Sequence, residues 1–266
     1  SLLQKTFSTM NQSCELPLTP ANRLRLAEAF RHNPRVDYSI DCVIEGQMGR
    51  ARVDDPAAPT AWCITVGPFW YFAGDAHGPG GRALSAELPP FNLLMPSPLE
   101  WTVAVKERFG DRLVTFPRYS FDAGTLSEAG LSAVLNASPH RDRVLRADAA
   151  LLARPDNYIE FEDFDSAEDF LARGIGYTLM EDNKLTGAAY SSLVCSRGIE
   201  VSLFIDEPYR RRGIATAISA ALLLECVRRG LRPNWDAANP ESCALAGKLG
   251  YTPIGTYESY YYPPAS

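Results

Sequence analysis

The stretch of residues 199–215 constrains the fold most, because three consecutive arginines join an apolar strand pattern to an apolar helix pattern. Residues 199–205 have the character of a strand. Residues 213–229 are apolar on nearly every side, which is typical of a helix that is covered rather than exposed. We therefore expect a strand, a basic turn and a helix that packs on a sheet.

The position of the arginines is electrostatically unusual. A helix N-terminus carries partial positive charge, so each cation there costs about 0.3–1 kcal/mol. Three cations make sense where an anion normally occupies the same place, because helix N-termini bind phosphate through free backbone N–H groups. Gly213 and Ala215 let the backbone come close to such an anion. The alternative interpretation is a solvated basic turn before a core helix.

Composition excludes several classes of partner. The 266 residues are 46% hydrophobic and carry a net charge of −6, so the chain can bury a core but lacks the basic footprint of a nucleic-acid or anionic-membrane surface. No apolar run approaches the ~18–20 residues of a membrane span, and the first residues lack the apolar core of a signal peptide. We expect a cytoplasmic protein that binds neither nucleic acid nor membrane.

The cysteines and histidines predict no metal site. The six cysteines are scattered without a Cys-x-x-Cys pair, and the three histidines show no metal-ligand spacing. Buried thiols in a reducing compartment are the expected state.

Residues 1–120 predict a small α+β domain, and residues 121–152 predict a helical connection. Within the first domain, helices are predicted at residues 18–32 and 97–109, strands at 38–45, 49–54 and 61–74, and a loop at 77–82.

Residues 153–266 predict a second domain in which strands and helices alternate. The predicted elements are a strand at 158–161, a helix from the cap Ser166 to Gly174, a hairpin over 175–195, a strand at 199–205, a helix at 213–229, a strand at 231–237, a helix at 239–249 and two closing strands over 251–262. No internal repeat is visible in the sequence.

Two segments of the second domain resemble the GNAT superfamily of acetyl-CoA-dependent acetyltransferases. Residues 210–215 match its signature Gln/Arg-x-x-Gly-x-Gly/Ala at every specified position, and residues 239–251 resemble its segment Asn-x-x-Ser/Ala…Lys-Leu-Gly-Phe/Tyr. The order of the predicted elements and the interval between the segments are also similar to those of the superfamily. Residues 70–75, 170–176 and 235–242 resemble a bacterial subfamily that has an additional N-terminal domain.

The resemblance implies an α+β fold: a C-terminal GNAT domain with a mixed, splayed β-sheet flanked by helices, after a smaller α+β N-terminal domain. It implies acetyl-CoA as co-substrate and no metal. The pyrophosphate would bind backbone N–H groups of the turn, and the pantetheine arm would lie along the preceding strand. The residues implied to bind the cofactor are Leu203, Phe204, Ile205, Arg210, Arg211, Arg212, Gly213, Ile214, Ala215, Asn239 and Lys248. Asn239 is alternatively a helix cap, and Lys248 an exposed helix lysine.

The implied chemistry requires a general base, because an alkylammonium must lose a proton before its nitrogen attacks a thioester. Glu200 resembles the position of a general-base glutamate in several relatives, and Asp236 is the second candidate. Glu200 is alternatively an ordinary exposed strand carboxylate. The superfamily's usual tyrosine acid corresponds here to Ala246, which has no acidic proton.

Ser242 lies one helical turn before Ala246 and is the candidate general acid, although a small residue packed on the sheet fits the same position. Tyr251 and the tyrosines at 260–262 are further candidates. We predict an acetyl-CoA-dependent N-acetyltransferase that acts on the primary amine of a small molecule by direct attack on the thioester. The alternatives are an acetyltransferase of protein lysine or N-terminus, and a catalytically weak acetyl-CoA-binding module. A homodimer is left open.

Overall fold

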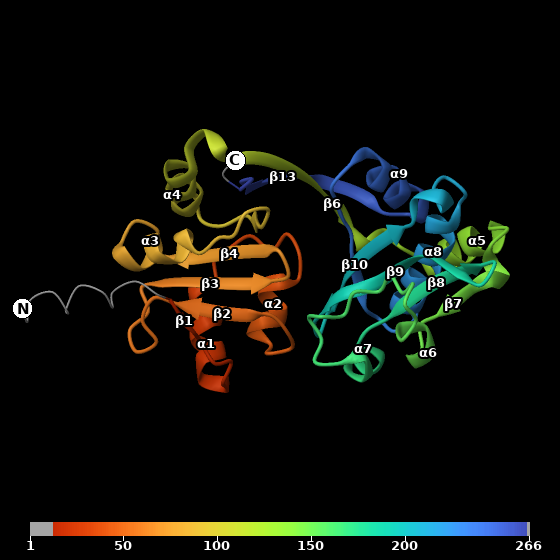
Figure 1. Ribbon diagram of the computed structural model, residues 1–266, viewed down its shortest axis with the longest axis horizontal. Helices are drawn as coiled ribbons and strands as arrows, with labels where there is room; N and C mark the ends of the chain where they lie inside the picture. Colours follow the sequence, from red (N-terminus) through yellow and green to blue (C-terminus); the bar gives the residue numbers. More distant parts are fainter. Residues whose placement is uncertain (1–12, 265–266) are drawn as a thin grey trace, which may run out of the picture. The chain divides into compact units, whose positions relative to one another are not determined.

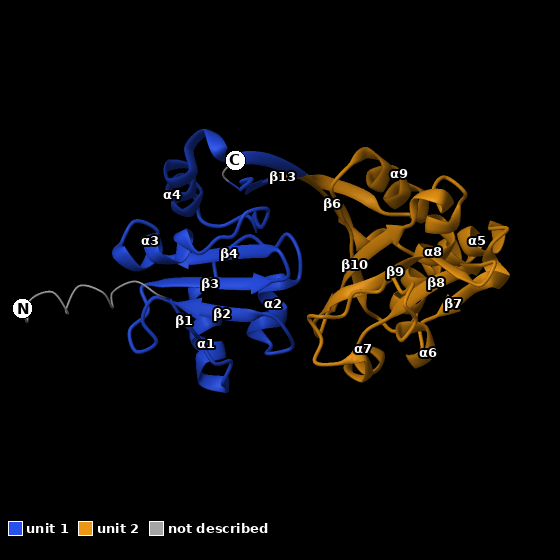
Figure 2. Cartoon of the chain, in the orientation of Figure 1, with its two compact units in different colours: residues 1–117, 258–266 blue, residues 118–257 orange. Residues whose placement is uncertain are grey.

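The computed structural model describes residues 13–264, which form two compact units (Figures 1 and 2). Unit 1 runs to Pro117 and resumes at Glu258, and unit 2 is Arg118–Tyr257. These limits differ from the predicted domains, because residues 121–152 belong to unit 2 and the last residues of the chain return to unit 1.

Unit 1 is built on a mixed sheet in which β1 to β4 pair antiparallel in sequence order and β4 pairs with β5 in parallel. Its core includes Phe72 and Trp101, whose rings stack with centroids 4.6 Å apart. The elements are β1 Cys14–Glu15, α1 Pro20–Ala29, α2 Ser39–Ile44, β2 Arg50–Val53, β3 Ala61–Val66, β4 Phe69–Gly74, α3 Pro79–Ala86, β5 Leu93–Leu94, α4 Leu99–Phe109, a 3₁₀ turn Gly110–Arg112, the start of β6 Val114–Asp122 and the end of β13 Thr252–Tyr261.

Three predictions for unit 1 need correction. Residues 61–74 were expected to be one strand but form the hairpin of β3 and β4, because the chain turns at Gly67, whose φ is 52°. Residues 38–45 were expected to be a strand but contain α2, because the Asp37 carboxylate accepts a hydrogen bond from the Ser39 N–H and the buried Ile40 and Val43 are three residues apart. Residues 77–82 were expected to be a loop but contain the first turn of α3. Pro79 begins that helix, where its missing N–H costs nothing.

Unit 2 contains a five-stranded sheet in the order β11-β10-β9-β8-β7, and α8 packs against it. Ten residues of α8 are buried, as its apolar sequence predicts. The elements are the end of β6, a 3₁₀ turn Ala123–Thr125, α5 Glu128–Ala137, a 3₁₀ turn Arg141–Arg143, β7 Val144–Arg146, α6 Ala149–Leu152, α7 Ala167–Arg173, β8 Gly176–Glu181, β9 Lys184–Val194, β10 Gly198–Ile205, a 3₁₀ turn Glu207–Tyr209, α8 Ile214–Arg228, β11 Arg232–Asn234, β12 Asp236–Ala237, α9 Pro240–Leu249 and the start of β13.

Four expectations for unit 2 need correction. Residues 121–152 were expected to be a helical connection but also contain the strand β7, which pairs with β8. Residues 158–161 form no strand, because the Asn157 side chain bonds both the N–H and the carbonyl of Ile159 and so makes a local turn. Residues 231–237 form two strands, since β11 pairs with β10 and β12 pairs with β6. Residues 251–262 form the single strand β13.

The two units repeat one order of elements. Unit 1 runs strand, two helices, three strands, helix, strand, helix, strand from β1 to β6, and unit 2 repeats that order from β7 to β13, with β11 and β12 as one divided strand. The pairing repeats as well, because β4 with β5 and β10 with β11 are the parallel pairs of their sheets. The repeat is therefore structural, although the sequence shows none.

Candidate functional site

The sheet of unit 2 opens along β10. Among the described residues, β10 pairs with β11 only from Gly198 to Glu200, whereas it pairs with β9 as far as Ile205. The register shifts between Glu200 and Val201, where the opening begins. Backbone groups that point away from β9 beyond this shift are available to an added strand-like ligand.

A cleft of about 910 Å³ lies at this opening. It brings together ten of the eleven predicted cofactor residues and two of the three predicted catalytic residues. Its lining residues are Arg118, Val201, Ser202, Leu203, Phe204, Ile205, Tyr209, Arg210, Arg211, Gly213, Ile214, Ala215, Thr216, Trp235, Asp236, Ala238, Asn239, Glu241, Ser242, Leu245 and Lys248.

The basic turn before α8 has left-handed backbone at Arg211 (φ 60°) and Gly213 (φ 81°). The helix begins at Gly213 without a side-chain cap, and the first intrahelical bond there runs from Ala217 N–H to the Gly213 carbonyl. The N–H groups of the first helical residues, Ile214 to Thr216, therefore have no acceptor within the helix. Such N–H groups at a turn with left-handed residues form an anion-binding concavity.

The three arginines of this turn do different things. Arg210 lines the cleft, and its Nε donates to the Ile205 carbonyl at 3.0 Å. Arg211 also lines the cleft. The Arg212 side chain instead pairs with Glu181, with Nη2 2.8 Å from Oε2, so a phosphate contact from this side chain is not what the structure shows.

Helix α9 brings Asn239 and Lys248 to the cleft. The Asn239 side chain accepts a hydrogen bond from the Ser242 N–H at 2.9 Å, which makes it the N-cap of α9. This cap uses the side-chain oxygen, so the N–H₂ group of Asn239 is a hydrogen-bond donor that the cap does not use. This geometry is therefore compatible both with Asn239 as the helix cap and with Asn239 as a contact of the cofactor.

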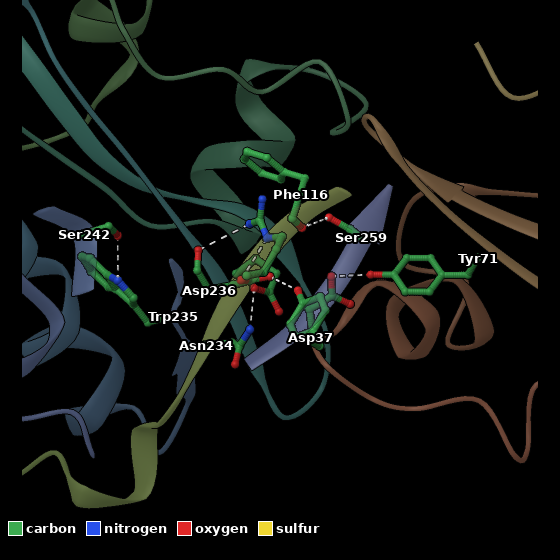
Figure 3. Close-up of polar contacts among 11 residues, drawn as sticks. Asp37, Tyr71, Phe116, Asn234, Trp235, Asp236, Ser242 and Ser259 are labelled. Atoms are coloured by element: carbon green, nitrogen blue, oxygen red, sulfur yellow. Dashed lines mark hydrogen bonds and ion pairs between the residues drawn. The ribbon is translucent and has the colours of Figure 1, made fainter. Parts of the chain in front are cut away.

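Asp236 lies in the cleft with its carboxylate bonded on both oxygens (Figure 3). Oδ1 accepts from Arg118 Nε at 3.0 Å, and Oδ2 accepts from the Tyr257 hydroxyl. Burial raises the pKa of Asp236, and the charge and hydrogen bond of Arg118 offset only part of that effect. A carboxyl with a raised pKa is suited to proton transfer.

Arg118 and Tyr257 are site residues that sequence reasoning missed. Arg118 precedes Asp236 by 118 residues and lies in β6, outside both motifs. Arg118 and Asp236 meet because β6 pairs with β12, where Asp236 lies opposite Ser120. No local pattern in the sequence signals this pairing.

Glu200 is the last residue of β10 that pairs with β11, and it is not among the residues that line the cleft. Its Oε2 accepts from Asn234 Nδ2 at 2.8 Å (Figure 3). Of the two candidate bases, Asp236 is therefore the one within the cleft.

Ser242 is placed to donate a hydrogen bond. Its Oγ accepts from Trp235 Nε1 at 3.1 Å (Figure 3), which leaves the hydroxyl hydrogen for another partner. Ala246 is fully buried, so a tyrosine there would require repacking. The Tyr251 hydroxyl is itself buried and donates to the Pro233 carbonyl.

Tyr260 and Tyr262 belong to unit 1, where their hydroxyls donate to Glu258 and to the Leu88 carbonyl. Within residues 13–264, no cluster of three or more histidine, cysteine, aspartate or glutamate side chains could hold a metal ion. No helix in that range has the length and apolar character to cross a membrane.

Comparisons with known proteins place the chain in context. The family model described as GNAT acetyltransferase matches residues 30–260. The uncharacterized N-acetyltransferase YdfB of Bacillus subtilis is 28% identical over 102 residues, which cover 38% of this chain and only 39% of YdfB. A GCN5-related N-acetyltransferase-like protein from Streptococcus suis is 28% identical, with a TM-score of 0.78 over 92% of this chain and 100% of that one. A tandem GNAT protein from the clavulanic acid biosynthesis pathway shares the fold at 12% identity, with a TM-score of 0.56 over 96% of this chain and 99% of that one.

Proposed function

The chain belongs to the GNAT acetyltransferase family, and we propose that this acetyltransferase takes its acetyl group from acetyl-CoA and transfers it to the primary amine of a small molecule. The observation that carries the proposal is one cleft that contains both the uncapped turn before α8 and the open edge of β10.

The cofactor would lie along these two features. Its pyrophosphate accepts hydrogen bonds from the backbone N–H groups of the turn, with Arg210 and Arg211 nearby as counter-charges. Its pantetheine arm extends along β10 from Ile205 toward Val201, in the place of an added strand. Lys248, exposed on α9, is available to the nucleotide end.

The reaction is then a direct displacement at the thioester. The amine nitrogen attacks the carbonyl carbon, a C–N bond forms, and the C–S bond breaks with its electron pair on sulfur. Asp236 takes the proton that the amine must lose, directly or through a water molecule. The Ser242 hydroxyl donates a hydrogen bond to the departing thiolate. The acylated nitrogen releases a second proton as the C–S bond breaks, and this proton ends on the sulfur, so the products are the amide and the CoA thiol.

Asp236 is favoured as the base over Glu200 because it lines the cleft and burial raises its pKa. A buried carboxylate also suits a cationic acceptor, and the net charge of −6 attracts one. Asn234 would hold Glu200 in place as a part of the strand structure.

The test is a pair of measurements on the purified chain. Calorimetric titration should show that CoA binds much more tightly than pantetheine, because the turn binds the diphosphate. A screen of small amines with acetyl-CoA should then release CoA thiol for at least one class of acceptor. Equal affinity for CoA and pantetheine would overturn the cofactor site, and acetylation of proteins but of no small amine would overturn the acceptor class.

A further inference from the structure

A buried histidine lies behind the turn that we assign to the cofactor. His140, which is only 6% exposed, follows α5 and precedes the 3₁₀ turn Arg141–Arg143. We propose that His140 is a positioning residue: it aims the backbone N–H of Gly213 at the cofactor pyrophosphate by holding the Arg212 carbonyl. This inference rests on the proposed acetyl-CoA site and adds a residue outside the cleft lining to it.

The partners of the two ring nitrogens determine which nitrogen of His140 carries the proton. Nε2 lies 2.6 Å from the Arg212 carbonyl oxygen, which can only accept, so Nε2 carries the proton. Nδ1 lies 2.5 Å from Arg143 Nη2, which can only donate, so Nδ1 presents its lone pair. These two partners therefore select one tautomer of the imidazole and fix its orientation.

Glu181 completes the support. Its carboxylate accepts from Arg143 Nη1 at 2.9 Å and pairs with Arg212 Nη2 at 2.8 Å. Burial acts to raise the pKa of Glu181, but the hydrogen bonds and charges of Arg143 and Arg212 outweigh it and lower the pKa. The carboxylate thus fixes Arg143 behind His140 and turns the Arg212 side chain away from the anion site.

The geometry of one peptide group gives this network a consequence in the cleft. The Arg212 carbonyl and the Gly213 N–H belong to one planar trans peptide, so they point in opposite directions. Because His140 holds the carbonyl, the N–H is directed away from His140. Gly213 lines the cleft, with His140 as its neighbour on the other side, where an added Cβ would lie 3.8 Å from the ring.

A free turn would sample other orientations of this peptide, because Gly213 tolerates a wide range of backbone angles. Fixing the peptide before the cofactor arrives lowers the ordering cost of binding. The effect belongs to the diphosphate alone, since the pantetheine arm lies along β10. Comparing ligands with and without the diphosphate therefore tests the proposed role of His140 most directly.

The experiment compares His140→Ala, His140→Asn and His140→Gln. Loss of one hydrogen bond to the turn should weaken CoA binding and raise KM for acetyl-CoA about threefold to tenfold, with kcat unchanged. Glutamine reaches as far as imidazole Nε2 and has a donor and an acceptor, so it should restore much of the affinity. Asparagine is too short and should behave as alanine does.

The ligand series separates positioning from general structural damage. Binding of acetyl-pantetheine, which has no diphosphate, should be the same in all three variants and the parent chain. His32→Ala, at an exposed histidine of unit 1, is the matched control and should change neither affinity.

Equal CoA affinity in the parent and in His140→Ala would overturn the inference while leaving the proposed function intact. Equal losses for CoA and acetyl-pantetheine would also overturn it, because they would indicate a structural effect on the whole cleft. Failure of the parent chain to bind CoA would instead overturn the proposed function.

Discussion

At the scale of single residues, the Asp236 carboxylate is fixed in its position in the cleft, because its two oxygens accept hydrogen bonds from Arg118 and Tyr257. Asp236→Asn keeps the size of the side chain but removes the ability to take a proton. We expect kcat to fall about 10²–10⁴-fold, as for loss of a general base. CoA affinity should stay unchanged by calorimetry. Glu200→Gln is the contrasting variant, and a larger loss in that variant would show that Glu200 is the base.

The same carboxyl predicts a pH dependence. A general base works when deprotonated, so the rate falls as pH drops through its pKa. Burial raises the pKa of Asp236 above the ordinary 3.8, so the fall should begin at higher pH than for an ordinary aspartate. A kcat–pH profile at saturating substrate checks this. The residual activity of Asp236→Asn should lack this limb, and an unchanged limb there would assign it to another group.

Gly213 tests the turn. Its φ of 81° disfavours any Cβ, although an added Cβ would make only an ordinary van der Waals contact, 3.8 Å from the His140 ring. Gly213→Ala should therefore cost about 1–2 kcal/mol of unfolding free energy and weaken CoA binding. Gly247→Ala is the matched control in α9, where the added Cβ would meet no atom within 4 Å beyond the nearby backbone of its own helix. That change should stabilise the chain by about 0.5–1 kcal/mol, by urea denaturation, and leave CoA affinity unaltered.

At the scale of elements, α9 begins at a residue with two proposed roles. Asn239→Ala removes the N-cap and should lower the free energy of unfolding by about 1 kcal/mol. Asn239→Asp keeps the cap but replaces the amide, which we propose to contact the cofactor, with a carboxylate. We expect normal urea stability and weaker CoA binding in this variant, so the two roles separate. Normal CoA affinity in Asn239→Asp would leave Asn239 as a cap only.

The elements that the sequence predicts well are those with long or local signals. The apolar helix α8, the cap Ser166 of α7 and the hairpin of β8 and β9 follow from periodicity and turn residues. The turn before α8 followed from charge and from the resemblance together. Helix α2 was mistaken for a strand because its six residues are too few for the helical period to stand out against β-branched residues.

The parts of the site that could not be predicted depend on long-range pairing. Arg118 reaches Asp236 only through the pairing of β6 with β12, and His140 reaches the turn from a segment 72 residues earlier. Strand pairing between distant segments has no local sequence signal. The division of residues 231–237 into β11 and β12 has the same origin, because each half finds a different partner strand.

At the scale of the whole molecule, the repeated element order gives each unit a turn between the first strand of its parallel pair and the helix that connects the two strands. In unit 1 this turn lies between β4 and α3, and the Asp75 carboxylate accepts from the N–H groups of His77 and Gly78 at 3.0 Å each. Asp54 lies beside it, so close that a Cβ on Gly80 would be 2.2 Å from Oδ2. The chain's own carboxylates thus occupy the place that a phosphate would take.

We therefore expect one CoA molecule per chain. Calorimetry should give a stoichiometry near one, and Gly213→Glu should abolish all of the binding heat, because a carboxylate would then fill the turn of unit 2 as well. Binding of a second CoA that survives in Gly213→Glu would show that the turn in unit 1 is open to ligands.

Strand β13, which crosses the limit between the units, affects the order in which the protein can fold during synthesis. β13 begins in unit 2 and ends in unit 1, where Tyr260 pairs with Leu94 of β5. Residues 13–117 leave the ribosome first, yet their sheet lacks a strand until residues 258–261 have also emerged. Unit 1 is therefore begun before unit 2 but completed after it, and the edge of β5 stays uncovered while unit 2 is translated.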